Sequence, residues 1–152
     1  MGRTVPWHHC KNLQKKVTLC NVYRPPRDRN EDIERFLTDL SPCISTLSDE
    51  PSDKLIMGDF NIDVLKTNIR EKYADFLDLM LNNDFLPKIT LPTRFSEKSA
   101  SLIDNIFCNF SHSTKSCRSG IIFTDLSDHF PYFTCLNQKI NLKGPPDRKS
   151  VV

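Results

Sequence analysis

One stretch constrains this chain more than any other, the sequence LIMGDFNID at residues 55–63. Its apolar beginning predicts a buried β-strand that ends at Gly58. Asp59 and Asn61 stand two residues apart, so in an extended chain their side chains point the same way while Phe60 turns into the core. A carboxylate and an amide so placed can hold a water molecule or a hard cation beside a phosphate. The plainer interpretation is that both residues only form a turn.

The composition allows one globular domain. A chain of 152 residues can bury a core of its own. Its formal net charge of +2 is far below that of a dedicated nucleic-acid binder, so a site for a polyanion has to be local. No apolar run reaches membrane-spanning length, and the sequence does not begin with a signal peptide. We therefore expect an intracellular protein, in the nucleus or the cytoplasm, that does not enter membranes.

The six cysteines predict free thiols rather than a disulfide framework, because the chain is not small and contains no C-x-x-C pair. His8-His9-Cys10 has the chemistry of metal ligands, but no second pair stands at zinc-site spacing. Neither feature by itself defines a site.

Hydrophobic patterning in the first half of the chain predicts strands separated by helices. Val17–Tyr23 predicts a strand that the following prolines end. Asn30 is expected to cap a helix that Pro42 kinks or ends, with a second short helix over residues 44–47. Residues 71–81 predict the clearest amphipathic helix.

The second half predicts mostly strands. Residues 85–91 predict an edge strand, because Pro87 cannot donate to a ladder. Residues 102–108 predict a strand that carries Asp104 in an apolar run, where a carboxylate needs a partner. Loops are expected at 111–120 and 127–129, and further strands at 121–123 and 131–136.

The ends of the chain differ from its middle. Residues 1–12 are expected to form an unstructured leader and residues 138–152 a disordered tail. Residues 13–137 predict one mixed α/β layered domain, because helices separate only the earlier strands.

Polar side chains gather in the loops and at strand ends, at Tyr23, Asp59, Asn61, Asp104, Asp128 and His129. Hydrolysis of a phosphodiester requires a positioned water, a group that takes its proton, and a cation for the developing charge. His129 is the natural proton-transfer group, and Asp104 would fix its tautomer. Asp59 and Asp128 are hard oxygen ligands that suit Mg²⁺.

Four segments resemble, in the same order, the motifs of the endonuclease/exonuclease/phosphatase superfamily: Val22-Tyr23-Arg24-Pro25-Pro26, Met57-Gly58-Asp59-Phe60-Asn61, Leu102-Ile103-Asp104-Asn105-Ile106-Phe107 and Ser127-Asp128-His129-Phe130-Pro131. Within it the chain looks most like the apurinic-type endonuclease domain of non-LTR retrotransposons of the jockey and chicken-repeat kind. The Pro92-Thr93-Arg94 segment adds to that likeness. The resemblance extends over residues 17–136.

The resemblance implies a DNase-I-like four-layer α/β sandwich with mixed sheets, and a phosphodiesterase site that depends on Mg²⁺ or Mn²⁺. It implies that His129 lies at the scissile phosphate and that Asp104 orients it. Asp59 would position or deprotonate the attacking water, Asn61 would bind the phosphate, and Tyr23 would contact it or assist the leaving group. The resemblance also places Asp128, with Asp59, at the metal.

The expected partner is DNA, and the expected oligomeric state is a monomer. Arg24, Arg27 and Arg94 are candidate phosphate contacts, because guanidinium groups match phosphate oxygens. Solvated loop charges are an equally good interpretation of these arginines.

One departure from the family pattern sets two hypotheses against each other. In the family, an asparagine motif and a metal-binding glutamate motif precede the tyrosine strand, and nothing before Val17 resembles either. The resemblance therefore implies an N-terminally truncated domain that lacks its first strands, with no reverse-transcriptase region after it. The chain is then either a Mg²⁺-dependent endonuclease or an inactive relic that at most binds nucleic acid or protein. A phosphatase acting on a small or lipid phosphate is a third reading.

Overall fold

The computed structural model describes residues 7–9, 17–27, 29–49, 51–110 and 117–136. Its elements in chain order are β1 (Trp7–His9), β2 (Val17–Tyr23), α1 (Asn30–Asp49), β3 (Asp53–Asp59), the 3₁₀ turn η1 (Val64–Lys66), α2 (Glu71–Leu81), β4 (Leu86–Pro87), β5 (Arg94–Ser96), β6 (Ser99–Ser101), β7 (Asp104–Cys108), β8 (Cys117–Ile121) and β9 (Tyr132–Leu136).

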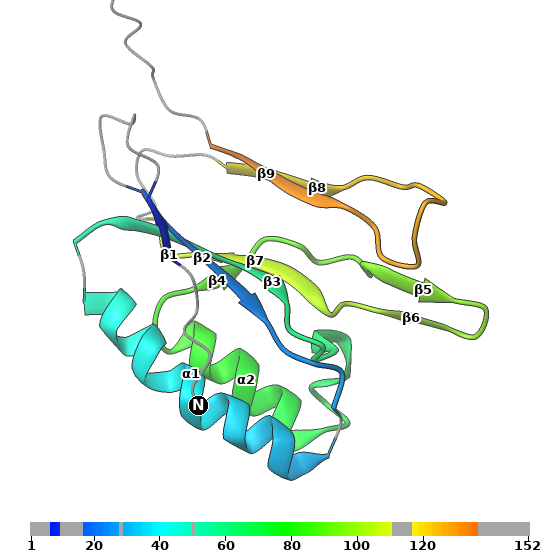
Figure 1. The fold of residues 1–152 in the computed structure, drawn as a ribbon, viewed down its shortest axis with the longest axis horizontal. Coiled ribbons are helices and arrows are strands. Elements are labelled where there is room, and N and C mark those ends of the chain that lie inside the picture. The colour runs from blue at the N-terminus through cyan, green and yellow to red at the C-terminus, as the bar shows by residue number, and fades with distance from the viewer. Residues whose placement is uncertain (1–6, 10–16, 28, 50, 111–116, 137–152) are drawn as a thin grey trace, which may run out of the picture.

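The centre of the fold is a five-stranded sheet in the order β1-β2-β3-β7-β4. Strands β2 and β3 are parallel, and β1, β7 and β4 each pair antiparallel with their neighbours. A parallel pair needs a crossover, which α1 supplies. Figure 1 shows α1 and α2 together on one face of this sheet and β8–β9 beyond its other face. The predicted α/β sandwich with a mixed sheet is confirmed, and three of its four layers are visible in the described residues.

Each face of the sheet has its own apolar core. Toward the helices, Tyr73, Phe76 and Met80 on the predicted apolar face of α2 are buried, whereas Leu81 is 38% exposed. Phe76 packs against Phe60 and Phe107 at ring-centroid distances of 5.0 and 5.7 Å. On the opposite face, the buried residues are Val17, Leu55, Ile89, Leu102, Ile106 and Cys108, and side chains of β8 and β9 pack against them. The central sheet is therefore packed on both faces, by the two helices on one side and by β8 and β9 on the other.

The predicted end of the helix at Pro42, with a second short helix over residues 44–47, is wrong, because α1 extends over 20 residues from Asn30 to Asp49 and includes Pro42. A proline inside a helix removes one backbone hydrogen bond. Leu40 and Ile44, on either side of Pro42, are both buried against the sheet, and this packing outweighs the loss. The cap prediction is also wrong by one position, since the carbonyl of Arg29, not Asn30, accepts the first helical bond from the N–H of Ile33.

Several strand boundaries also differ from expectation. Strand β7 begins only at Asp104, because the carbonyls of Leu102 and Ile103 accept from the backbone of Val64 and Phe60 rather than from a strand. Strand β8 covers residues 117–121, most of which were expected to be loop. Strand β4 lies at the edge of the sheet, as its proline predicted.

The N-terminal prediction is wrong for Trp7–His9, which pair with β2 as strand β1. The rest of the predicted leader, the predicted tail and the side chains of His8, His9 and Cys10 lie outside the described residues. The five cysteines within the described part are free thiols. Neither of the helices described there is long and apolar enough to cross a membrane.

Candidate active site

Three of the predicted site residues meet at one end of the central sheet. In the strand register, Asp59 of β3 stands opposite Tyr23 of β2 on one side and opposite Asp104 of β7 on the other. The parallel pairing of β2 with β3 explains the first match, and the antiparallel return of β7 explains the second. Sheet pairing therefore brings together residues that lie up to 81 positions apart in the sequence.

Gly58 allows the close pairing of β3 with β2 near the end of the strand. Its φ of +151° lies in a region that side-chain-bearing residues rarely adopt, and a Cβ atom there would lie 1.7 Å from the carbonyl oxygen of Val22. Strand β2 can therefore approach β3 this closely only because residue 58 is glycine. The close approach fixes where Asp59 leaves the sheet.

The loop after Gly58 confirms the predicted alternation. Phe60 is 1% exposed in the core between the helices and the sheet. Asn61 has φ +48°, a conformation that asparagine tolerates better than most residues, and its N–H donates to Oδ1 of Asp59 at 3.0 Å. Its Nδ2 donates to the carbonyl of Arg24 at 2.7 Å, so part of the predicted phosphate-binding amide is already used.

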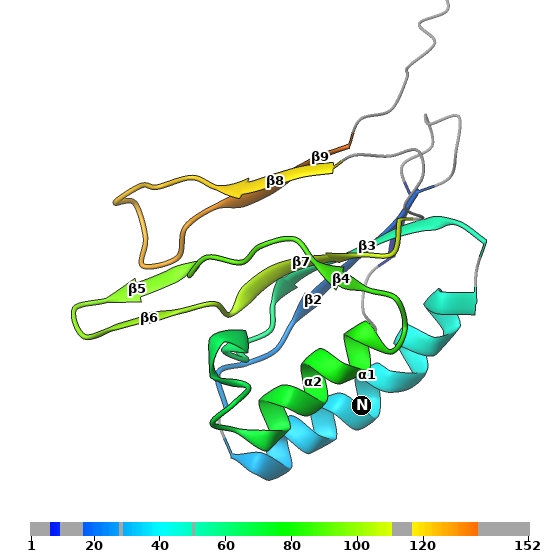
Figure 2. The same ribbon diagram turned by 180° about the vertical axis from the view of Figure 1, so that it is seen from behind.

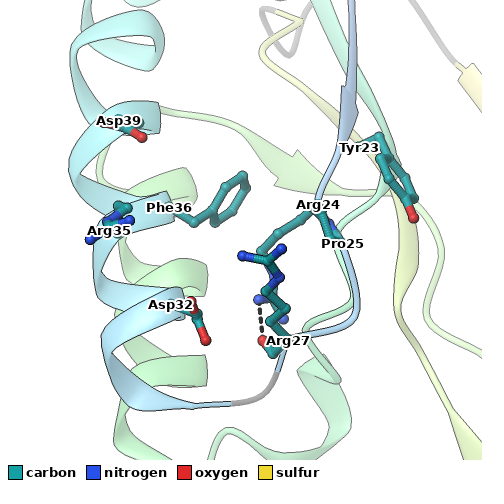
Figure 3. A pocket seen from close by; sticks show the side chains of 8 residues that line it. All are labelled: Tyr23, Arg24, Pro25, Arg27, Asp32, Arg35, Phe36 and Asp39. Atoms are coloured by element: carbon teal, nitrogen blue, oxygen red, sulfur yellow. Dashed lines mark hydrogen bonds between the residues drawn. The ribbon is translucent and has the colours of Figure 1, made fainter. Parts of the chain in front are cut away.

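Arg24 binds the backbone of this loop. It is therefore buried and does not form the phosphate contact that the sequence predicted. Its side chain is 4% exposed and donates to the carbonyls of Phe60 at 2.7 Å and Asn61 at 2.6 Å, and to that of Arg27. Figure 3 shows the guanidinium inside a cavity between β2 and α1, facing Phe36. A charged donor satisfies loop carbonyls that would otherwise be buried unpaired.

Tyr23 and Arg27 remain available at the surface. Tyr23 is 64% exposed, and Figure 3 shows its ring on the side of β2 away from Arg24. Arg27 lines the cavity of about 190 Å³ beside α1. Their predicted contacts with substrate stay predictions.

His129 and Asp104 form the predicted pair. Nδ1 of His129 lies 3.1 Å from Oδ2 of Asp104, which is 5% exposed. A hydrogen bond from Nδ1 to the carboxylate leaves Nε2 as the nitrogen that exchanges a proton. The carboxylate in the apolar strand thus has the partner that its burial required.

Thr93 completes this chain of contacts, and the sequence gave it no chemical role. Its hydroxyl donates to Oδ2 of Asp104 at 2.7 Å and accepts from the backbone N–H of Asp104 at 3.1 Å. The carbonyl of Thr93 accepts from the N–H of Phe130 at 2.7 Å, so the same residue also fixes the loop of His129. Its place in the Pro92-Thr93-Arg94 segment of the family resemblance was the signal that the sequence offered, and its burial is visible only in the structure.

Tyr132 is a second residue that sequence reasoning missed. It lies in β9 and is partly buried against the core beside β7. Burial, with the nearby carboxylates of Asp104 and Asp59, raises the pKa of Tyr132 to about 12. Its phenol therefore stays neutral beside the two acids.

Among the residues that the structure describes, one group of side chains could hold a metal ion. Ligand atoms of Asp59, Asp104 and His129 all lie within 4.8 Å of one another. Burial raises the pKa of Asp59, and repulsion by Asp104 adds to it, so a divalent cation would relieve an unfavourable charge there. Mg²⁺ is commonly held by one or two carboxylates together with water and substrate phosphate. The residues present therefore fit such an ion, with Asp59 as its main carboxylate.

Asp128 lies outside this group. Its Oδ2 accepts from Nε of Arg94 at 2.9 Å, and both side chains are exposed. The guanidinium lowers the pKa of Asp128 below its usual value. Its predicted role as a metal ligand, and that of Arg94 as a phosphate contact, stay predictions.

Comparison with known proteins identifies the family. The family model described as endonuclease-reverse transcriptase matches residues 17–133 of this chain. No curated protein matches the chain.

Solved structures with the same fold are distant in sequence. The chain is similar to an endonuclease/exonuclease/phosphatase family protein from Leptotrichia buccalis, with 16% identity and a TM-score of 0.51 over 84% of this chain and 52% of that one. It is similar to a mannosyl-6-phosphatase from Bacteroides thetaiotaomicron, with 18% identity and a TM-score of 0.55 over 86% and 55%. A family protein from the same organism gives 16% and 0.56 over 86% and 54%.

The chain spans about half the length of these solved structures. At such identities the likeness shows the fold alone, and the family follows from the match over residues 17–133. The chain belongs to the endonuclease–reverse transcriptase family and has the fold of endonuclease/exonuclease/phosphatase proteins.

Proposed function

We propose that this chain is a phosphodiesterase domain of retrotransposon origin that hydrolyses DNA phosphodiester bonds with Mg²⁺ or Mn²⁺. The observation that carries the proposal is the Thr93–Asp104–His129 series of contacts, which ends beside Asp59 at the sheet end. Membership of the endonuclease–reverse transcriptase family supports the same chemistry.

The chain's own residues supply the proton transfers. Asp59 has a raised pKa because it is partly buried, so it is a better proton acceptor for an attacking water than an ordinary aspartate. His129, held through Nδ1 by Asp104, presents Nε2 to the phosphate. Asn61 and Tyr23 flank Asp59 and would contact the phosphate oxygens.

A bound divalent cation would be held mainly by Asp59, with Asp128 as a further predicted ligand. It would stabilise the negative charge that develops on the phosphate oxygens. The carboxylates of Asp59 and Asp104 repel each other, and a bound cation would reduce this repulsion even in the absence of substrate.

DNA fits the surroundings of the site better than a small phosphate. Arg94 lies opposite His129 in an antiparallel bridge, and the exposed Arg27 follows strand β2. A basic side chain beside the reacting phosphate suits a substrate that carries further phosphates. We expect the chain to act on it as a monomer.

The test is nicking of supercoiled plasmid by the purified chain, with Mg²⁺ or with EDTA. His129→Ala should lower the nicking rate about 10²- to 10⁴-fold, the usual contribution of a proton-transfer group. Thr38→Ala, on the exposed face of α1, is the control, and this variant should nick at the wild-type rate.

Two outcomes would count against the proposal. Nicking that persists in EDTA or in His129→Ala would assign the cleavage to a contaminant. DNA binding without any Mg²⁺-dependent nicking would support the alternative of an inactive relic.

A further inference from the structure

Two cysteines lie between the central sheet and the β8–β9 sheet. Cys108 is the last residue of β7 and is 2% exposed, and Cys117 is the first residue of β8. Cys108 belongs to the buried apolar core on this face of the central sheet, and Cys117 packs against the same core. A bond between the two thiols would therefore join the two sheets covalently.

The directions of the strands bring these two residues to the same end of the layer. At the other end, Tyr132 of β9 lies near Asp104 of β7, where burial and the Asp104 carboxylate raise the pKa of the phenol. Each strand runs for five residues from there, to Cys108 in β7 and to Leu136 in β9. Figure 2 shows β9 running in the same direction as β7, with the start of β8 where β7 ends. Since Cys117 stands opposite Leu136, it lies beside the end of β7.

Side-chain alternation turns both thiols into the space between the sheets. Cys117 shares its face of β8 with Ile121, and both pack toward the central sheet. Cys108 shares its face of β7 with Ile106, and both are buried in the same core. Burial raises the pKa of the Cys108 thiol, and the nearby Cys117 thiol adds to this rise. Cys135 of β9, by contrast, is exposed.

We propose that Cys108 and Cys117 form a redox pair, which a disulfide oxidant converts into a disulfide between the central sheet and the β8–β9 sheet. A disulfide requires Cα atoms within about 7 Å of each other, and disulfides between facing sheets of β-sandwich proteins meet this requirement. Cys117 is the first residue of its strand, where a small shift disturbs few ladder hydrogen bonds. This redox pair does not depend on the function proposed above.

The oxidation proceeds by two thiol–disulfide exchanges. Cys117 is the more accessible thiol, so its thiolate attacks one sulfur of oxidised glutathione, forms a mixed disulfide and releases one glutathione thiolate. The Cys108 thiolate then attacks Sγ of Cys117 and releases the second glutathione. The chain loses two protons and two electrons, and one glutathione disulfide is reduced to two glutathione thiols.

The disulfide would restrain the β8–β9 sheet, and the segment between these two strands carries His129. Local opening of a two-stranded sheet exposes its backbone amides to hydrogen exchange. A covalent link at the start of β8 opposes this opening. We therefore expect slower amide exchange in β8 and β9 of the oxidised chain than in the reduced chain.

The first test is disulfide mapping. The full chain is equilibrated with graded ratios of oxidised to reduced glutathione, its free thiols are blocked with N-ethylmaleimide, and a tryptic digest is analysed by mass spectrometry. Trypsin cuts after Lys98, Lys115 and Arg118, so the two cysteines fall in separate peptides. We expect peptide 99–115 to be joined to peptide 116–118 in the wild type and not in Cys117→Ser. The control Cys135→Ser should form the link at the same glutathione ratio as the wild type.

The second test is thermal unfolding. Oxidation should raise the melting temperature of the wild type and of Cys135→Ser by about 5–10 °C, because a cross-link restricts the unfolded chain. It should not raise that of Cys117→Ser. Two results would overturn the proposal. One is free Cys108 and Cys117 at a ratio where Cys135 already carries glutathione, and the other is a disulfide from either residue to a different cysteine. Neither test measures nicking, so its outcome is separate from that of the proposed function.

Discussion

The two halves of the candidate site are held in different ways. The central half, with Asp59 and Asp104, belongs to strands β3 and β7 of the five-stranded sheet, and every residue of β7 is buried. The peripheral half, with Arg94, Asp128 and His129, belongs to two-stranded sheets and the loop between β8 and β9. The side chains of these three residues are 43%, 55% and 32% exposed, respectively.

Two polar side-chain contacts join the halves at the site. The hydroxyl of Thr93 donates to Asp104 at 2.7 Å, and His129 meets Asp104 at 3.1 Å. Away from the site, apolar side chains of β8 and β9 pack against the core of the central sheet. The difference predicts that stability and the proposed activity depend on different parts of the molecule. Changes in the central half should unfold the chain, whereas changes at the junction should mainly misplace His129.

The largest effect is expected at Gly58. Gly58→Ala places a Cβ atom against the backbone of Val22 and imposes a strained φ, so it should lower the free energy of unfolding by about 3 kcal/mol or more. Urea denaturation measures the change. Gly120→Ala is the control, because its Cβ would meet only the movable ring of Phe133 at 3.2 Å. Equal losses of unfolding free energy in the two variants would show that the central half contributes no more to stability than the peripheral half.

The next effect is expected at Arg24. Arg24→Met keeps the apolar stem but removes the donors to the carbonyls of Phe60 and Asn61. We expect a loss of about 3 kcal/mol, since charged hydrogen bonds disappear and buried carbonyls stay unpaired. Thermal and urea unfolding test this. Arg29→Met, at an exposed ion pair with Asp32, should change stability very little. A loss as large as that of Arg24→Met would show that burial of Arg24 is not the cause of the effect.

Thr93→Val tests the junction. The variant conserves shape but removes the donor to Oδ2 of Asp104, so stability should fall by about 1–2 kcal/mol. If the nicking activity is confirmed, its rate should fall by about tenfold, because orienting partners of this kind typically contribute that much. Thr38→Val, whose hydroxyl bonds only to the helix carbonyl of Glu34, is the control. An unchanged nicking rate in Thr93→Val would remove Thr93 from the site.

The smallest effect on stability is expected at Asp59, and it should have the opposite sign. The folded state raises the pKa of Asp59, so the wild type loses stability as pH rises from about 4 through that raised pKa. Asp59→Asn lacks this loss and should unfold at a higher temperature than the wild type at pH 7. The two melting curves should converge as pH falls toward 4. A less stable variant at pH 7 would show that Asp59 is not under electrostatic strain.

Much of this molecule was predictable because local rules govern it. The stripe of α2, the inward Phe60 and the edge position of Pro87 follow from side-chain periodicity and proline geometry. The pairing of Asp104 with His129 followed from the cost of a lone buried carboxylate. The predicted helix end at Pro42 was wrong because the burial of Leu40 and Ile44 on either side of the proline stabilises the continuous helix.

The sequence by itself determined which chemical groups stand at the strand ends and in what order. Only the tertiary structure decided how they are used. It buried Arg24 under the loop, paired Asp128 with Arg94, and brought Thr93 and Tyr132 to the two acids. The contacts of Arg24 and Asp128 join residues 37 and 34 positions apart in the chain, so they depend on sheet register and layer packing. Periodicity within a short segment carries no information about either.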